Sequence, residues 1–101
     1  MEDPGDLVIR VVEVKGRCPA YEAGDTFRIE RGFMLNSEKP LCMHSLASLL
    51  PYYVALSRRI SPKDLGLCRE GDEAFLQCLD PCGHTGGGTA LFAVRREGAG
   101  E

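Results

Sequence analysis

The sequence predicts a small α+β domain, in which a mainly antiparallel sheet of about four strands carries one kinked helix, or two short helices, on one face. A chain of 101 residues is long enough for one domain and too short for two. Four strand-like segments alternate with glycine- and proline-containing turns. A single stretch with helical spacing lies between the second and third of them. The resulting order, β-β-α-β-β, is typical of an antiparallel sheet covered on one side.

The first two strand-like segments precede the helical stretch. Residues 7–14 are rich in β-branched side chains and almost continuously apolar, which predicts a central strand. Pro19 lies beyond its end, where a residue without an N–H group cannot interrupt the sheet hydrogen bonds. Residues 26–30 alternate with a period of two and place Phe27 and Ile29 on one face. The two segments are therefore expected to be neighbouring strands.

The middle of the chain is expected to pass from a loop into a helix. Residues 33–41 predict a loop, and the helical pattern begins at about Cys42. Spacings of three and four then build one apolar stripe from Leu46, Leu49, Leu50, Tyr53 and Leu56. Pro51 interrupts this stripe, because proline inside a helix removes a donor and clashes with the preceding turn. The pattern predicts a kink, or two short helices that meet near Leu50.

The last part of the chain predicts a connector and two more strands. Residues 60–71 form the connector, and residues 73–79 and 89–96 predict the strands. Between the strands lies a loop, residues 80–88, that contains three consecutive glycines and is expected to be mobile. This glycine run does not have the spacing of a phosphate-binding loop and does not open a helix.

Net charge and the lack of a long apolar segment argue against a nucleic-acid partner and against a membrane. Asp and Glu number 15 against 12 Lys and Arg, for a net charge of −3, whereas a nucleic-acid-binding domain needs a basic face. The two basic pairs, Arg58-Arg59 and Arg95-Arg96, are short and lie near acidic residues, so they are interpreted as solvated surface. No segment approaches the roughly 18 apolar residues that span a bilayer. The sequence predicts neither a nucleic-acid partner nor a membrane.

The chain is expected to be one cytoplasmic domain with short tails. Residues 6–97 form the expected α+β domain, and residues 1–5 and 98–101 are expected to be flexible. The acidic start of the chain lacks the apolar core of a secretion signal, which favours the cytoplasm. A single sheet with helices on one side leaves a face or an edge open, so a protein partner or a homo-oligomer is expected.

Cysteines are the residues most suggestive of chemistry. The chain has five, and in a reducing compartment an odd number predicts thiols or metal ligands rather than a disulfide framework. Cys42 lies at the predicted start of the helix, close to His44, where the partial positive charge of a helix end favours the thiolate. It is a candidate nucleophile, redox thiol or metal ligand. The alternative is a small buried apolar residue.

Two further cysteine positions have ligand-like surroundings. Cys18 precedes Pro19, which holds its backbone extended and directs its side chain. Cys78, Cys82 and His84 form a Cys-x3-Cys-x-His cluster, and thiolate and imidazole are the groups that zinc prefers. The spacing differs from that of the common zinc fingers, and Cys78 also suits a buried strand position. Cys68, in the connector, is expected to have no role.

Four short motifs together resemble a family of short prokaryotic proteins without an assigned activity. That family is marked by Gly-x-Cys-Pro, Gly-Asp-x-Phe, Leu-Cys-Pro before a helix, and Cys-Pro-Asp-Pro near the end. This chain has Gly16-Arg17-Cys18-Pro19, Gly24-Asp25-Thr26-Phe27, Leu41-Cys42 and Cys78-Leu79-Asp80-Pro81. The resemblance covers residues 7–97 and implies that Cys18, Cys42 and Cys78 are the characteristic cysteines.

The chain departs from the family pattern in three places. Met43 and Leu79 stand where the family has proline after its second and third cysteines. Glu22 and its neighbours replace a Gly-His pair that often follows the first Cys-Pro. The loss of that histidine changes any shared metal-ligand set, in which Cys82 or His84 would be the substitute.

Three functions follow from these observations. In the first, the protein is a cytoplasmic accessory or binding protein that holds zinc or another soft metal. Its ligands are Cys18, Cys42 and Cys78, with Cys82, His84 and His44 as additional candidates. In the second, Cys42 carries redox or nucleophilic chemistry with Cys18 or Cys78 as partner. In the third, the cysteines are structural and the protein binds a partner. The sequence favours an accessory protein over a stand-alone enzyme.

Overall fold

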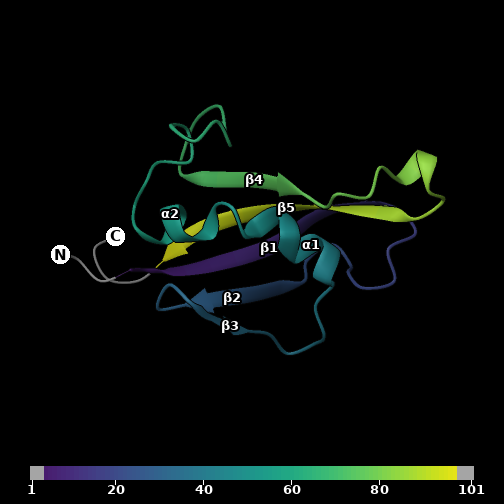
Figure 1. The fold of residues 1–101 in the computed structure, drawn as a ribbon, viewed down its shortest axis with the longest axis horizontal. Helices are drawn as coiled ribbons and strands as arrows, with labels where there is room; N and C mark the ends of the chain where they lie inside the picture. Colours follow the sequence, from purple (N-terminus) through teal and green to yellow (C-terminus); the bar gives the residue numbers. More distant parts are fainter. Residues whose placement is uncertain (1–3, 98–101) are drawn as a thin grey trace.

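A computed structural model describes residues 4–97 and shows one five-stranded antiparallel sheet with two short helices on one face (Figure 1). The strand order across the sheet is β3-β2-β1-β5-β4. In chain order, the elements are β1 (Asp6–Gly16), β2 (Thr26–Glu30), β3 (Met34–Asn36), α1 (Met43–Leu49), α2 (Tyr53–Ser57), β4 (Glu73–Gln77), the 3-10 turn η1 (Cys82–His84) and β5 (Gly88–Glu97). The α+β class predicted from the sequence is confirmed.

The long strand β1 forms the centre of the sheet, as its apolar run predicts. It pairs antiparallel with β2 along one edge and with β5 along the other. The pairing with β5 shifts between Val11 and Glu13, which leaves Val12 as an extra residue in a β-bulge. Beyond the bulge the two strands remain paired as far as Gly16 and Gly88, so they extend past the part of β1 that the helices cover.

The predicted strand count and strand order are wrong at β3. Met34–Asn36 lies in the stretch expected to be a loop, and it pairs with β2 through Leu35 and Ile29. Arg31 and Gly32 reverse the chain between the strands with φ of 58° and 86°. All three β3 side chains are exposed, so the strand has no alternation of buried and exposed residues that periodicity could detect. The observed order is β-β-β-α-α-β-β.

The helical segment divides at Pro51, which confirms the prediction of two short helices. At the end of α1, Leu50 N–H donates a hydrogen bond to Leu46 O. At the start of α2, Leu56 N–H donates a hydrogen bond to Tyr52 O. Both helices pack on the sheet face that carries the core. The largest fully buried apolar side chains of this core are Leu7, Ile9, Val11 and Phe92. Part of the inner helix surface consists of serines and not of apolar residues. One of them, Ser48, donates a hydrogen bond from its Oγ atom to Gln77 O at 2.7 Å.

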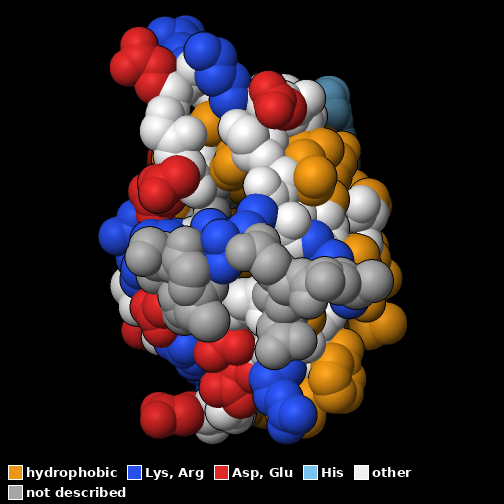
Figure 2. Space-filling model, turned by 90° about the vertical axis from the view of Figure 1, so that its left-hand side faces the viewer, with side chains coloured by type: hydrophobic (Ala, Val, Ile, Leu, Met, Phe, Trp, Pro, Cys, Tyr) orange, Lys and Arg blue, Asp and Glu red, His pale blue; other side chains and the backbone are white. Residues whose placement is uncertain are grey.

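The opposite face of the sheet is open and charged. Arg28, on β2, reaches the carboxylates of Asp6, Glu30 and Glu97 at 3.3, 3.5 and 2.7 Å. Arg10 and Glu73 form a further pair at 3.8 Å. Figure 2 shows acidic and basic side chains mixed along its left-hand side, the side away from the helices. The solvent side of the sheet therefore carries ion pairs, as in an ordinary half-exposed antiparallel sheet, together with Phe75, which is 43% exposed.

The ends of the expected domain coincide with the ends of the sheet. The tails expected to be flexible, residues 1–5 and 98–101, lie mostly outside the described residues. Within that first range, Gly5 is buried, and its N–H donates to Ser57 O at 2.8 Å. Neither α1 nor α2 has the length and apolar character needed to cross a membrane, and residues 4–97 contain no other helix that does.

Candidate functional site

The five cysteines are free and half-buried, and all but Cys82 lie in loops or at the ends of helices and strands. Cys42 is the N-cap residue of α1, as predicted, and it packs with Cys18 against the margin of the core. Cys78 follows the end of β4, and its N–H donates to Ala90 O at 2.9 Å. Cys82 begins η1. Each of these side chains is positioned by the fold, but by a different part of it.

The predicted metal ligands do not form a recognisable metal centre. Within residues 4–97, no group of three or more His, Cys, Asp or Glu side chains is arranged to hold a metal ion. This covers Cys18, Cys42 and Cys78, and also the additional candidates Cys82, His84 and His44. Both histidines are exposed. A soft-metal site therefore stays a prediction from the sequence.

A closed ring of hydrogen bonds surrounds Cys42. Its backbone N–H donates to the Tyr21 hydroxyl at 3.0 Å, and that hydroxyl lies 2.7 Å from Ser45 Oγ. Ser45 Oγ in turn donates to the Cys42 carbonyl at 2.7 Å. The Cys42 side chain makes no capping hydrogen bond, and Tyr21 accepts instead from the backbone N–H of the N-cap residue itself, the donor that a Glu or Gln three residues later satisfies in a capping box. The motif that contains Cys42 thus has a clear structural role through its backbone.

The loop around Cys82 packs against the end of β1. The Cys82 thiol donates to Gly87 O at 3.5 Å, and Arg17 N–H donates to the same carbonyl at 3.2 Å. Asp80 accepts hydrogen bonds from the Thr85 hydroxyl and from Cys82 N–H, and these bonds, that from Thr85 foremost, hold the pKa of its carboxyl below the ordinary value. The stretch between β4 and β5 is therefore a hydrogen-bonded turn, although its glycines predict a mobile loop.

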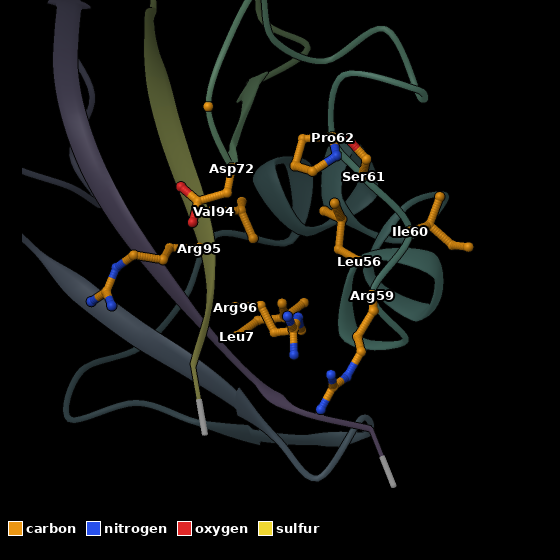
Figure 3. Close-up of a pocket in the computed structure, with 11 residues that line it drawn as sticks. Leu7, Leu56, Arg59, Ile60, Ser61, Pro62, Asp72, Val94, Arg95 and Arg96 are labelled. Atoms are coloured by element: carbon orange, nitrogen blue, oxygen red, sulfur yellow. The ribbon is translucent and has the colours of Figure 1, made fainter. Parts of the chain in front are cut away.

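A cavity of about 610 Å³ opens where β1 begins and β5 ends. Its apolar walls come from the sheet, from the end of α2 and from the connector that follows; they include Leu7, Leu56, Ile60, Pro62 and Val94. Arg59, Arg96 and Asp72 supply charge, and Figure 3 shows Arg59 and Arg96 extending from facing walls. Sequence reasoning missed this site because it interpreted both arginine pairs as solvated surface. The alternation of β5 is the signal that could have found it, since Arg96 shares the core-facing side of Val94.

The outer surface of α1 and α2 is also unusual. Met43, Leu50 and Val54 are exposed by 70, 57 and 52 per cent, and Ala47 is exposed between them. These positions follow helical spacing along the side that faces away from the sheet. Figure 2 shows apolar side chains along its right-hand side, which is the helix side of the molecule in Figure 1. We call Met43, Ala47, Leu50 and Val54 the outer stripe.

Comparison of the chain with protein-family models, with curated proteins and with solved structures finds no match. The family resemblance of the four cysteine-containing and glycine-containing motifs therefore stays a prediction. The cavity and the outer stripe are the two features of the described chain from which a function can be argued.

Proposed function

We propose that the protein is a small accessory protein that works through protein–protein docking on the outer stripe of α1 and α2, and that a second copy of the chain is its partner. One observation carries this proposal. Residues 41–57, which contain both helices, include no Asp, Glu, Lys or Arg, although 27% of the whole chain is charged.

The absence of charge concerns the outside of the helices and not only the core. A helix that covers a sheet normally presents charged and polar residues to water, and a helix that is apolar all round is normally buried. Here the inner surface contains Ser45, Ser48 and Ser57, whereas the outer stripe contains methionine, alanine, leucine and valine. Contiguous exposed apolar surface of this kind marks an interaction site.

Charge complementarity favours a second copy as the partner. A charged partner surface would lose water against the outer stripe without finding a counter-ion, and unpaired buried charges are costly. The outer stripe of another copy meets this requirement, because it is equally free of charge. Two copies related by a two-fold axis would place the same residues of each stripe in contact, which is the usual geometry of homodimers. The open sheet face, with its many ion pairs, is a poor candidate for this contact.

Sedimentation equilibrium tests the proposal by comparing the wild type with Leu50→Asp. We expect the wild type to self-associate with a dissociation constant on the order of 1–10 µM, because the stripe is short compared with the interfaces of tight dimers. Leu50→Asp places a charge at the centre of the stripe and should leave only monomer. Sodium chloride at high concentration should not dissociate the wild-type dimer, because its contact contains no ion pairs.

Leu79→Asp is the matched control. Leu79 is 67% exposed and lies outside the helices, so this variant introduces the same charge at an equally accessible leucine elsewhere. It should dimerise like the wild type, and circular dichroism should show that both variants are folded. A wild type that stays monomeric at 200 µM, or equal loss of dimer in both variants, would rule out self-association through the stripe.

A further inference from the structure

We infer that the cavity between α2 and the end of β5 binds a monocarboxylate with an apolar body, and that Arg96 is the residue that recognises its carboxylate. The inference is independent of the docking surface, because no residue of the outer stripe lines the cavity.

The size and lining of the cavity suit a small organic ligand. Its volume of about 610 Å³ lies within the roughly 300–1,000 Å³ of typical ligand sites. The walls combine polar and aliphatic side chains, and the aliphatic ones include Leu7 and Val94 on the sheet and Leu56 and Ile60 on the helix side. A few polar groups in such a lining determine the orientation of a ligand, whereas the aliphatic surface holds its apolar part.

Arg96 is held in the cavity with unused hydrogen-bonding capacity. Its Nη1 atom is buried and has no hydrogen-bond partner among the described residues. Its aliphatic stem runs across Gly5: a Cβ atom added to Gly5 would lie 3.0 Å from Arg96 Cγ and 3.1 Å from Cδ. Glycine at this position therefore lets the stem lie close to the backbone and keeps the guanidinium group inside. Buried polar groups in folded proteins are nearly always paired, so an orphaned guanidinium nitrogen indicates a missing acceptor.

The charges around the cavity favour a monoanion. Arg59 and Arg96 contribute two positive charges and Asp72 contributes one negative charge to the lining. Arg95 also borders the cavity, but Figure 3 shows its side chain on the other side of β5, where it pairs with Glu97 at 3.3 Å. Arg96, whose buried Nη1 has no hydrogen-bond partner among the described residues, offers a single guanidinium group, which matches a carboxylate better than a phosphate dianion. A carboxylate also fits the planar hydrogen-bonding edge of a guanidinium group.

Isothermal titration calorimetry with octanoate, octanol and inorganic phosphate tests the chemistry of the site at pH 7 on the full chain. We expect octanoate to bind and octanol, which has the same alkyl chain without the charge, to bind at least about tenfold more weakly. Phosphate should bind more weakly than octanoate, because it cannot use the aliphatic walls. Octanol binding equal to octanoate binding, or tighter binding of phosphate, would overturn the inference. So would the absence of any heat and any chemical-shift change with octanoate.

Arg96→Met and Arg95→Met test the assignment to Arg96. Methionine keeps the apolar stem and removes the guanidinium group in each variant. Arg96→Met should weaken octanoate binding by about tenfold or more, while Arg95→Met, at the neighbouring position of the same strand, should stay within about twofold of the wild type. Equal effects of the two variants would contradict a specific role for Arg96. Thermal unfolding of both variants establishes that they are folded.

A free acid and the carboxyl terminus of a peptide share this chemistry, and two short peptides distinguish them. Acetyl-Gly-Gly-Leu with a free carboxylate should compete with octanoate if the cavity admits a chain terminus, and its carboxamide form should not compete. Competition by the free peptide assigns the site to peptide termini as well as small acids. If octanoate binds and the free peptide does not compete with it, the site is restricted to small acids. Equal competition by the carboxamide would contradict carboxylate recognition.

Discussion

At the scale of single residues, Tyr21 links the hydrophobic core to the start of α1 at Cys42. It is 4% exposed, stacks against Phe27 and meets the edge of Phe92, and its hydroxyl closes the ring that joins Cys42 and Ser45. A tyrosine far from the helix in sequence therefore caps α1. This contact fixes the backbone of the N-cap residue, although the Cys42 side chain makes no capping hydrogen bond.

Tyr21→Phe should destabilise the protein by about 1–3 kcal/mol, because the variant removes the acceptor of the part-buried Cys42 N–H and the hydroxyl that contacts buried Ser45 Oγ. The free energy of unfolding from urea titration measures this loss. Tyr52→Phe is the control, since Tyr52 borders the core without a hydroxyl contact among the described residues, and its change should stay within about 0.5 kcal/mol. Equal stability of Tyr21→Phe and the wild type would show that water replaces the ring without cost.

At the scale of elements, the last paired residues of β1 and β5 lie unusually close to the backbone of neighbouring loops. Gly16 has φ of +71°, and a Cβ atom there would lie 2.5 Å from both Cys82 Sγ and Gly87 O. Gly88, its partner in the sheet, faces the backbone of Arg17 and Cys18 just as closely. The η1 turn can fold back over β1 only because these two strand residues have no side chains.

Gly16→Ala should cost about 2 kcal/mol or more, since it combines an unfavourable positive φ with steric overlap. Gly86→Ala separates the two causes: Gly86 has φ of +75°, but nothing lies within 4 Å of an added Cβ atom. Its cost should be that of the backbone conformation alone, about 1 kcal/mol. Thermal unfolding monitored by circular dichroism measures both. A Gly16→Ala variant no less stable than Gly86→Ala would contradict the packing of η1 on β1.

The strands and helices also show what local patterns can reveal. Residues 26–30 form β2 as their alternation predicts, and Pro51 divides the helical segment where the sequence predicts it. In contrast, β3 has three exposed side chains and depends for its existence on the turn at Arg31 and Gly32 and on the free edge of β2. Local propensity does not encode the presence of a neighbouring edge, so the short strand could not be predicted.

At the scale of the whole molecule, the two faces differ in charge. The open face of the sheet carries the ion pairs of Arg28 and Arg10, and the helix face carries the outer stripe (Figure 2). On the open face, the hydrogen bond from Arg28 holds the pKa of the Glu97 carboxyl below its ordinary value of 4.5. The backbone N–H of Arg31 and the Arg28 side chain likewise hold the pKa of Asp6 below 3.8.

Stability should therefore fall on acidification. A carboxyl group whose pKa is lower in the folded protein contributes stability that is complete above its unfolded pKa and is lost as the pH falls through its folded pKa. For Glu97 and Asp6, the midpoint of thermal unfolding should be nearly constant from pH 8 to 5 and decrease below about pH 4.5. Circular dichroism melting curves between pH 2.5 and 8 provide the measurement.

Arg28→Met is the informative variant for this pH dependence. It removes the main cause of the Glu97 shift, so the difference in melting temperature between wild type and variant should be present at pH 6 and become smaller at pH 3. A difference that is the same at both pH values would assign the role of Arg28 to packing of its side chain and not to its charge.

The sequence by itself determined the class of this protein, its central strand, the split helix and the approximate place of four of its five strands. These features depend on periodicity and on proline and glycine, which act within a few residues of the chain. Only the tertiary structure decided that β3 pairs and that Tyr21 accepts from the N–H of the N-cap residue of α1. It places no three His, Cys, Asp or Glu side chains of residues 4–97, the predicted cysteines included, so that they could hold a metal ion. It also decided that Arg96 lies in a cavity and that the outer stripe is exposed. These outcomes depend on which distant segments meet in space, a relation that residue type and spacing along the chain do not contain.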